Sequence, residues 1–530
     1  HLLVYPHGLR DQNAYYSPER VCLLFGYYNA TPLNGALYLP GGIVYSCLSH
    51  DIIAHETTHA LLDGMYSRFM ELTHPDMPGF HEGFADIVAL LQHFTFPEIV
   101  KNQLRKVRGA LDTENLLVKL AVEFGLSTGE RRSLRDAIGM TDKKGNWMLK
   151  PPSTFDYERA IECHDRGALL VSTVFDAFLA IYKSRTADLM RIATGRSGIV
   201  HTGELHPDLI GRLADEASKT ASHVLTMCIR ALDYCPPVDL NYGDYLRGLI
   251  TADKELVPDD ALNYRIAMIN AFRKRGIFPQ GVPNLSVETL TYPVLEEIKS
   301  PGFIKLNEYL RIVKEILAYK TDREEIFEAT VEAITGKRRG KPDKEGILNF
   351  LFDDKGKAFD AANLERITGL VFSDDYQSLG IPTSKSRKVG PSVEVHSLRI
   401  HHRIAQDGTL QNQIILTLCQ RASVYIMETN GEVDFVPYSK NSILNNAGKT
   451  MIFRGGCTLI FHLNNLCLHF AIRKPIFERV EGGQRRLHSG RLHMQYKCMY
   501  GELSEKIGLK EHEAHGEIFS FMHQSNHDIL

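Results

Sequence analysis

The spacing of apolar residues changes along the chain and separates a helical part from a later β part. Apolar residues recur every three or four positions through residues 50–62, 82–94 and 168–182, which predicts helices with one buried face. Beyond residue 390 the period falls to two at Val393–His396, and Asp407-Gly408 is a hairpin turn signal. The pattern predicts an α+β protein with an antiparallel β region late in the chain.

Residues 1–50 are predicted to form strands and turns that lead into the first helix. The stretch Asn13–Tyr16 and the apolar run Val21–Gly26 flank a Ser17-Pro18 turn signal. We expect these two stretches to pair with each other.

The chain of 530 residues is too long for one hydrophobic core, so we expect several domains. Proline punctuation at 279–301 and a polar stretch at 373–390 mark two linkers. The predicted units are a mainly helical domain over 1–278 with a short N-terminal β part, a helical region with linkers over 279–372, a small antiparallel β-domain over 391–475, and a polar tail over 476–530.

The composition is that of an ordinary globular protein, with 44% hydrophobic residues, 24% charged residues and a formal net charge of −3. This balance gives no overall attraction to nucleic acid or to an anionic membrane. No apolar run is long enough to span a bilayer, and the first residues lack a signal-peptide pattern. The nine scattered cysteines are typical of reduced thiols. We therefore expect a cytoplasmic protein with neither nucleic-acid nor membrane partners.

The first predicted helix carries the HExxH motif His55-Glu56-Thr57-Thr58-His59. Residues four apart share one face of a helix, so both imidazoles can bind one cation. Glu56 lies about 100° round the helix from His55, where its carboxylate can reach a water at the metal rather than the metal itself. A surface helix with two unrelated histidines is the alternative that the motif alone leaves open.

The next predicted helix supplies carboxylates that complete such a site. Catalytic zinc uses three protein ligands and keeps one position open. Glu82 is the candidate third ligand, and Asp86, one turn later on the same face, can hold a ligand histidine by its other ring nitrogen. His81 could compete as a ligand, although we expect it to be a neighbour. Zn²⁺ is the predicted cofactor.

HExxH followed by ExxxD on the next helix resembles the signature of the thermolysin-like gluzincin metallopeptidases. The resemblance extends over roughly residues 11–278 and implies a mainly helical thermolysin-like zincin domain with Glu56 as general base.

The family's substrate strand also has a counterpart. An Asn-Ala-aromatic-aromatic edge strand pairs with the extended substrate in those enzymes, and Asn13, Ala14, Tyr15 and Tyr16 match it. Strand addition of this kind takes its affinity from main-chain hydrogen bonds. An ordinary hairpin edge is the alternative.

Related enzymes carry a Leu-Arg pair whose arginine reaches a substrate carbonyl, and Arg135 is the candidate here. Arg131 and Arg132 lie close by, and a solvated basic turn fits the same residues.

His164 matches a family histidine that precedes a helix of small residues and donates a hydrogen bond to the oxyanion. A carboxylate normally orients this histidine, and Asp156, Glu158 and Glu162 are all candidates. A helix-capping surface histidine is the alternative. Cys163 invites a cysteine-protease interpretation, but no second catalytic constellation accompanies it.

The chain departs from the family pattern at one position. The family has a tyrosine, about three turns beyond the second zinc histidine, that shares the oxyanion with the later histidine. Met70 stands at that position here, and Tyr66, one turn earlier, is the candidate replacement.

Together these features predict a zinc metallo-endopeptidase that acts on peptide or protein substrates. Two alternatives stay open. The chain could be a gluzincin scaffold that binds or regulates and cleaves little, which Met70 favours, or a zinc hydrolase of a non-peptide amide or epoxide. No sequence feature indicates an oligomeric state.

Overall fold

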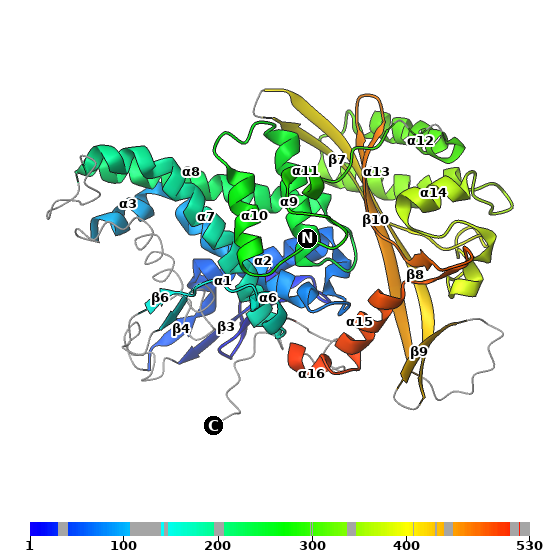
Figure 1. Ribbon diagram of the computed structural model, residues 1–530, viewed down its shortest axis with the longest axis horizontal. Helices are drawn as coiled ribbons and strands as arrows, with labels where there is room; N and C mark the ends of the chain where they lie inside the picture. The colour runs from blue at the N-terminus through cyan, green and yellow to red at the C-terminus, as the bar shows by residue number, and fades with distance from the viewer. Residues whose placement is uncertain are drawn as a thin grey trace.

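The computed structural model describes most of the chain and shows a mixed α and β fold with antiparallel sheets, as predicted (Figure 1). The described residues are 1–29, 41–106, 139–141, 147–194, 206–296, 298, 300–336, 346–405, 408–429, 432–438, 449–508 and 519. The candidate Arg135 lies outside them.

The N-terminal sheet contains strands β1 (Leu3–Leu9), β2 (Ala14–Ser17), β3 (Cys22–Asn29) and β4 (Ile43–Tyr45). β3 lies between β1 and β2, and β4 pairs with β3. The predicted pairing around Ser17-Pro18 is confirmed, because β2 and β3 run antiparallel with Ala14 opposite Phe25 and Ser17 opposite Cys22. β2 is an edge strand and lies against the first helix.

A layer of helices forms the largest hydrophobic core. Its main members are α1 (His50–Met65), α2 (Asp76–Phe94), α7 (Cys163–Ala193), α8 (Pro207–Ala231), α9 (Tyr242–Leu256) and α10 (Tyr264–Lys274). Short elements between and around them are η2 (Ser46–Leu48), η3 (Ser67–Met70), α3 (Pro97–Lys106), β5 (Gly139–Thr141), β6 (Trp147–Leu149), α6 (Asp156–Arg159) and η4 (Leu232–Tyr234).

Helix α7 is long and apolar enough to cross a bilayer by length and composition alone, but most of its apolar stretch is buried inside the molecule. It is therefore accounted for as a core helix.

Helices α2 and α7 approach each other closely because each has a glycine at the crossing. A Cβ built at Gly83 would lie 2.8 Å from the carbonyl oxygen of Gly167, and one at Gly167 would lie 2.9 Å from Cβ of Glu82. Any side chain at either position would push the helices apart. The close crossing brings the start of α7 beside Glu82.

A buried ion pair fixes the start of α7 against the start of α2. Asp76 is fully buried, and its carboxylate accepts hydrogen bonds from Arg166 Nε (2.6 Å), the Tyr157 hydroxyl (2.7 Å) and the Tyr242 backbone N–H (2.7 Å). The Arg166 guanidinium lies 3.8 Å from the Tyr157 ring centroid, a cation–π contact. The network joins three segments that are far apart in sequence.

The second half of the chain is built on a five-stranded antiparallel sheet. Its strands are β7 (Glu394–Ile404), β8 (Leu410–Thr429), β9 (Glu432–Pro437), β10 (Thr450–His462) and β11 (Leu468–Lys474), in the order β11-β10-β8-β7 with β9 also paired to β8.

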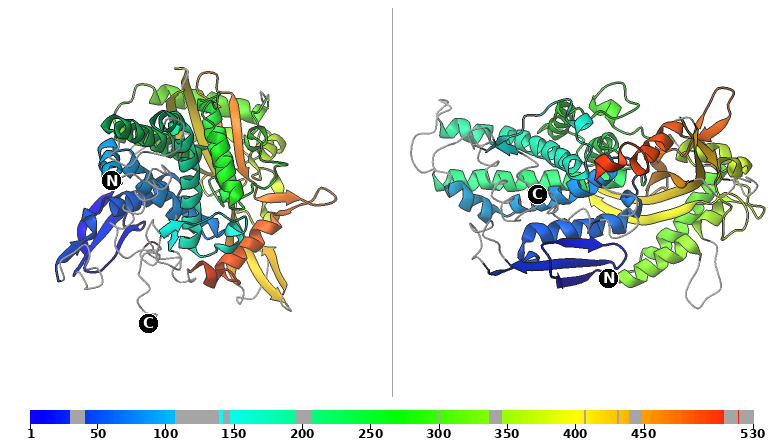
Figure 2. Two further views of the ribbon diagram at one scale, coloured as in Figure 1. Left: turned by 60° about the vertical axis from the view of Figure 1, so that its left-hand side comes forward. Right: turned by 90° about the horizontal axis from the view of Figure 1, so that it is seen from below.

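Both faces of this sheet are covered, as Figures 1 and 2 show. Side chains alternate between the faces of a strand. Leu416 accordingly packs with the core of α12 (Pro301–Leu317), whereas its neighbour Ile415 packs with Tyr234 and Ala252 on the side of the helical layer. The remaining elements of this half are α11 (Val287–Leu290), α13 (Arg323–Thr335), η5 (Ile347–Leu351), α14 (Ala361–Thr368), η6 (Asp374–Leu379), β12 (Phe477–Arg479), β13 (Arg485–Leu487), α15 (Ser489–Met499) and α16 (Ser504–Ile507).

All nine cysteines lie among the described residues, and none of them is in a disulfide.

Candidate metal centre

Helices α1 and α2 bring two imidazoles and one carboxylate together. The Nε2 atoms of His55 and His59 lie 2.9 Å apart. The Glu82 carboxylate lies 3.6 Å from Nε2 of His55 and 3.4 Å from Nε2 of His59. All three side chains are at least nine-tenths buried, and their ligand-type atoms all lie within 4.8 Å of one another, close enough to hold one metal ion. The predicted ligand set is brought together.

Asp86 lies behind the first of these imidazoles. Its carboxylate is 2.8 Å from Nδ1 of His55, which leaves Nε2 directed at Glu82 and His59. Burial alone would lower the pKa of His55, but the Asp86 and Glu82 carboxylates raise it to about 10. Burial lowers the pKa of His59, which keeps that ring neutral, the form that binds metals. Asp86 therefore fixes the tautomer and orientation of His55.

Replacing Asp86 by alanine is expected to weaken metal binding about 10–100-fold, because His55 would lose the partner that orients its ring. The measurement is zinc affinity by competition with a chromogenic chelator. Asp188→Ala, which removes an exposed carboxylate on α7, is the control. Unchanged affinity in Asp86→Ala would contradict the assigned role.

Glu56 is fully buried next to the edge strand of the N-terminal sheet. Its Oε2 accepts a hydrogen bond of 3.1 Å from the backbone N–H of Tyr16 in β2. The predicted base and the predicted substrate strand are therefore adjacent. Of the other strand candidates, Asn13 and Ala14 are buried and Tyr15 is half-buried, and Asn13 Oδ1 accepts from the Ala14 N–H (2.8 Å).

His164 lies in the first turn of α7, and Glu162 is the carboxylate that holds it. Oε1 of Glu162 lies 2.7 Å from Nδ1 of His164, and Oε2 accepts from the backbone N–H groups of His164 and Asp165. Burial opposes a charge on His164, but its contacts with Cys163 and Glu162 outweigh burial and raise its pKa. The nearby Glu82 carboxylate acts in the same direction. The histidine thus lies on the Glu82 side of the helix pair with a carboxylate behind it.

Cys163 does not have the properties of a nucleophile. Burial raises the pKa of its thiol to about 11. The thiol form therefore dominates at neutral pH, whereas nucleophilic attack requires the thiolate.

Tyr66 is held away from an oxyanion role by contacts with other parts of the molecule. It is fully buried, its hydroxyl donates to the carbonyl oxygen of Leu232 (2.7 Å), and Arg399 Nη2 donates to that hydroxyl (2.8 Å). The structure does not bring Tyr66 to the metal centre. Met70 packs at the edge of an apolar cluster that includes Tyr16.

Phe519 is a residue at this centre that sequence reasoning missed. Its ring centroid lies 4.2 Å from that of His59 and 5.9 Å from that of Tyr16. Phe519 belongs to no motif, and it lies 460 residues from His59 along the chain, so nothing in the sequence connects the two residues.

Two further groups of described residues have donor atoms close enough for a metal: His50 with Asp51 and His93, and Glu162 with Cys163 and His164. In the first, His93 pairs directly with the Asp51 carboxylate. The second is the helix cap described above.

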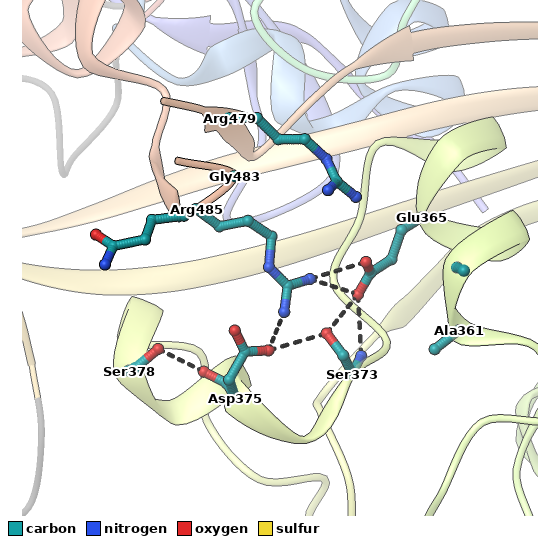
Figure 3. Close-up of a pocket in the computed structure, with 10 residues that line it drawn as sticks. Ala361, Glu365, Ser373, Asp375, Ser378, Arg479, Gly483 and Arg485 are labelled. Atoms are coloured by element: carbon teal, nitrogen blue, oxygen red, sulfur yellow. Dashed lines mark hydrogen bonds and ion pairs between the residues drawn. The ribbon is translucent and has the colours of Figure 1, made fainter. Parts of the chain in front are cut away.

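A separate pocket lies in the second half of the chain (Figure 3). Arg485 donates to Glu365 (2.8 Å) and also pairs with Asp375, and Ser373 Oγ donates to Glu365 (2.6 Å). These contacts tie the β12–β13 hairpin to α14 and η6. None of the residues that line this pocket belongs to the metal centre.

Comparison of the chain with known protein families, with curated proteins and with solved structures finds no match.

Proposed function

We propose that this protein is a zinc-dependent peptidase that cleaves peptide bonds in an extended substrate. The observation that carries the proposal is the convergence of His55, His59 and Glu82 within 4.8 Å, with the Glu56 carboxylate hydrogen-bonded to the neighbouring edge strand.

The donor set fits zinc. Two imidazole nitrogens and one carboxylate are a ligand combination of catalytic zinc sites, whereas calcium and magnesium prefer oxygen donors alone. His55, whose pKa is raised by Asp86 and Glu82, would release its proton on binding the metal. The carboxylate behind His55 is the usual partner of a zinc-binding imidazole. When bound, zinc supplies Lewis acidity and makes a water more acidic.

The side chains around the ligands would transfer protons, stabilise the oxyanion and bind the substrate. Glu56 would take a proton from the attacking water and deliver it to the leaving amine. His164, held by Glu162, would donate a hydrogen bond to the oxyanion. Strand β2, at the edge of the N-terminal sheet, would hold the substrate main chain by strand addition.

The test is digestion of a peptide library by the zinc-loaded protein, with and without a zinc chelator, and measurement of bound metal. We expect one equivalent of zinc and cleavage that stops with the chelator and returns on addition of zinc. Stoichiometric zinc without chelator-sensitive cleavage of any peptide would refute the peptidase proposal.

A second candidate is a zinc-binding scaffold that cleaves little. The position of Tyr66 favours it, because the hydroxyl that would replace the family's second oxyanion donor is occupied by Leu232 and Arg399. The same digestion separates the two candidates.

A further inference from the structure

The C-terminal part of the chain reaches the metal centre. Helices α15 and α16 run from the five-stranded sheet towards α6 and the N-terminal sheet (Figures 1 and 2). Ile507, at the end of α16, is fully buried in one apolar cluster with Ala14, Tyr16 and Cys163. Phe519 belongs to the same cluster and is also fully buried.

Three aromatic rings from three different elements surround the Phe519 side chain. His59 of α1 is tilted against it, with ring centroids 4.2 Å apart and ring planes at 32°. His81 of α2 lies at 5.5 Å and Tyr16 of β2 at 5.9 Å. These distances are at or near the range in which aromatic rings attract each other. The pocket is thus built for an aromatic ring and has a candidate metal ligand as one wall.

The His81 ring beside Phe519 also has a buried nitrogen without a hydrogen-bond partner among the described residues. Nδ1 of His81 lies 3.4 Å from Nδ1 of His59. Nε2 of the same ring is the buried, unpartnered nitrogen. A buried polar group without a partner calls for an explanation, and the main-chain polar groups of a bound peptide would provide one.

We propose that this pocket is a subsite for an aromatic side chain of the substrate, and that Phe519 occupies it as a stand-in from the same chain. The proposal rests on the proposed function and narrows its substrate class to peptides with an aromatic residue near the cleaved bond. The pocket wall made by Tyr16 belongs to the strand that would bind the substrate backbone. A peptide lying along that strand projects side chains at this position.

Occupation by Phe519 makes the subsite self-blocked. A tethered group competes at a high effective concentration, commonly in the millimolar range. The apparent affinity for an outside ligand falls with the fraction of the protein whose subsite is open. Removal of the Phe519 ring should therefore increase the affinity for aromatic ligands selectively.

The experiment measures binding by calorimetry to the zinc-loaded full-length protein. The probes are N-acetyl-L-phenylalaninamide and, as its matched control, N-acetyl-L-alaninamide. We expect Phe519→Ala to bind the phenylalanine probe about tenfold more tightly than the unsubstituted protein does, with no change for the alanine probe. Phe519→Tyr, which keeps a ring in the pocket, should behave like the unsubstituted protein.

Two results would overturn the subsite. An equal gain for both probes would show that Phe519 blocks access without defining an aromatic pocket. A large fall in melting temperature with no gain for the phenylalanine probe would show that Phe519 is a core residue; if Phe519→Ala does not fold, Phe519→Leu is measured in the same way. Because the readout is binding, it is independent of catalysis. Selective binding of the phenylalanine probe without chelator-sensitive cleavage would support the subsite and reject the peptidase proposal. Cleavage without selectivity for the phenylalanine probe would support the peptidase proposal and reject the subsite.

Discussion

Glu56→Gln is expected to retain a full equivalent of zinc and to lose peptide hydrolysis by about 10²–10⁴-fold, the range that general acid–base groups contribute. Glu56 is neither a proposed metal ligand nor a residue that orients one, so its charge is not needed to hold the ion. Its proposed role is to accept a proton from water, which an amide cannot do at neutral pH. The measurements are metal content and initial rates on a peptide that the unsubstituted protein cleaves.

Glutamine is the informative replacement because it preserves the packing around Glu56. The buried carboxylate accepts a hydrogen bond from the Tyr16 N–H at 3.1 Å, and an amide oxygen can accept the same bond. The edge strand should therefore keep its place. A truncation to alanine would instead leave that buried N–H without its Glu56 acceptor and would confuse chemistry with structure.

Asp63→Asn is the matched control for this variant. Asp63 lies on the same helix two turns later and accepts a hydrogen bond of 2.8 Å from the Tyr16 hydroxyl. The substitution makes the same change of charge on the same helix, beside the same strand residue, but away from the metal ligands. It should leave the rate within a small factor. Full activity in Glu56→Gln, or equal losses in both variants, would contradict Glu56 as the base.

The parts of the centre that could be predicted from the sequence are those fixed by the helical repeat. His55 and His59 meet because residues four apart share a helix face, and the same rule places Glu82 and Asp86 on one side of α2. The close approach of α2 and α7 has a weaker signal, since Gly83 and Gly167 are single residues within apolar runs. Their role emerges only when the two helices cross.

The parts that could not be predicted depend on contacts between distant segments. Glu162 is the partner of His164 because it caps the N-terminus of α7. The sequence offered three nearby carboxylates and did not distinguish between them. Tyr66 is unavailable as an oxyanion donor because its hydroxyl donates to the carbonyl oxygen of Leu232, 166 residues later. Phe519 reaches His59 from the other end of the chain. The spacing of residues along a sequence does not predict such long-range contacts.

The ion pair at the start of α2 leads to the largest expected effect on stability. Asp76→Ala should destabilise the protein by about 3–5 kcal/mol, because it leaves the buried Arg166 guanidinium without its carboxylate partner. The hydrogen bonds from Tyr157 and Tyr242 would lose their acceptor as well. Asp208→Ala is the control, since Asp208 also lies in the first turn of a helix, α8, but its side chain is 90% exposed. The measurement is thermal unfolding followed by circular dichroism.

The same carboxylate gives this difference a defined pH dependence. Burial alone would raise the pKa of Asp76, but Arg166, together with the bonds from His74 and Tyr157, lowers it well below the usual value near 4. A carboxyl group whose pKa is lower in the folded state stabilises the fold fully above its unfolded pKa, and this contribution is lost as the pH falls towards the folded pKa. The gap in melting temperature between the unsubstituted protein and Asp76→Ala should therefore be constant from pH 5 to 7 and shrink below about pH 4. A gap that stays constant through pH 3, or one as small as that of Asp208→Ala at pH 7, would show that the Asp76–Arg166 pair does not hold α2 and α7 together.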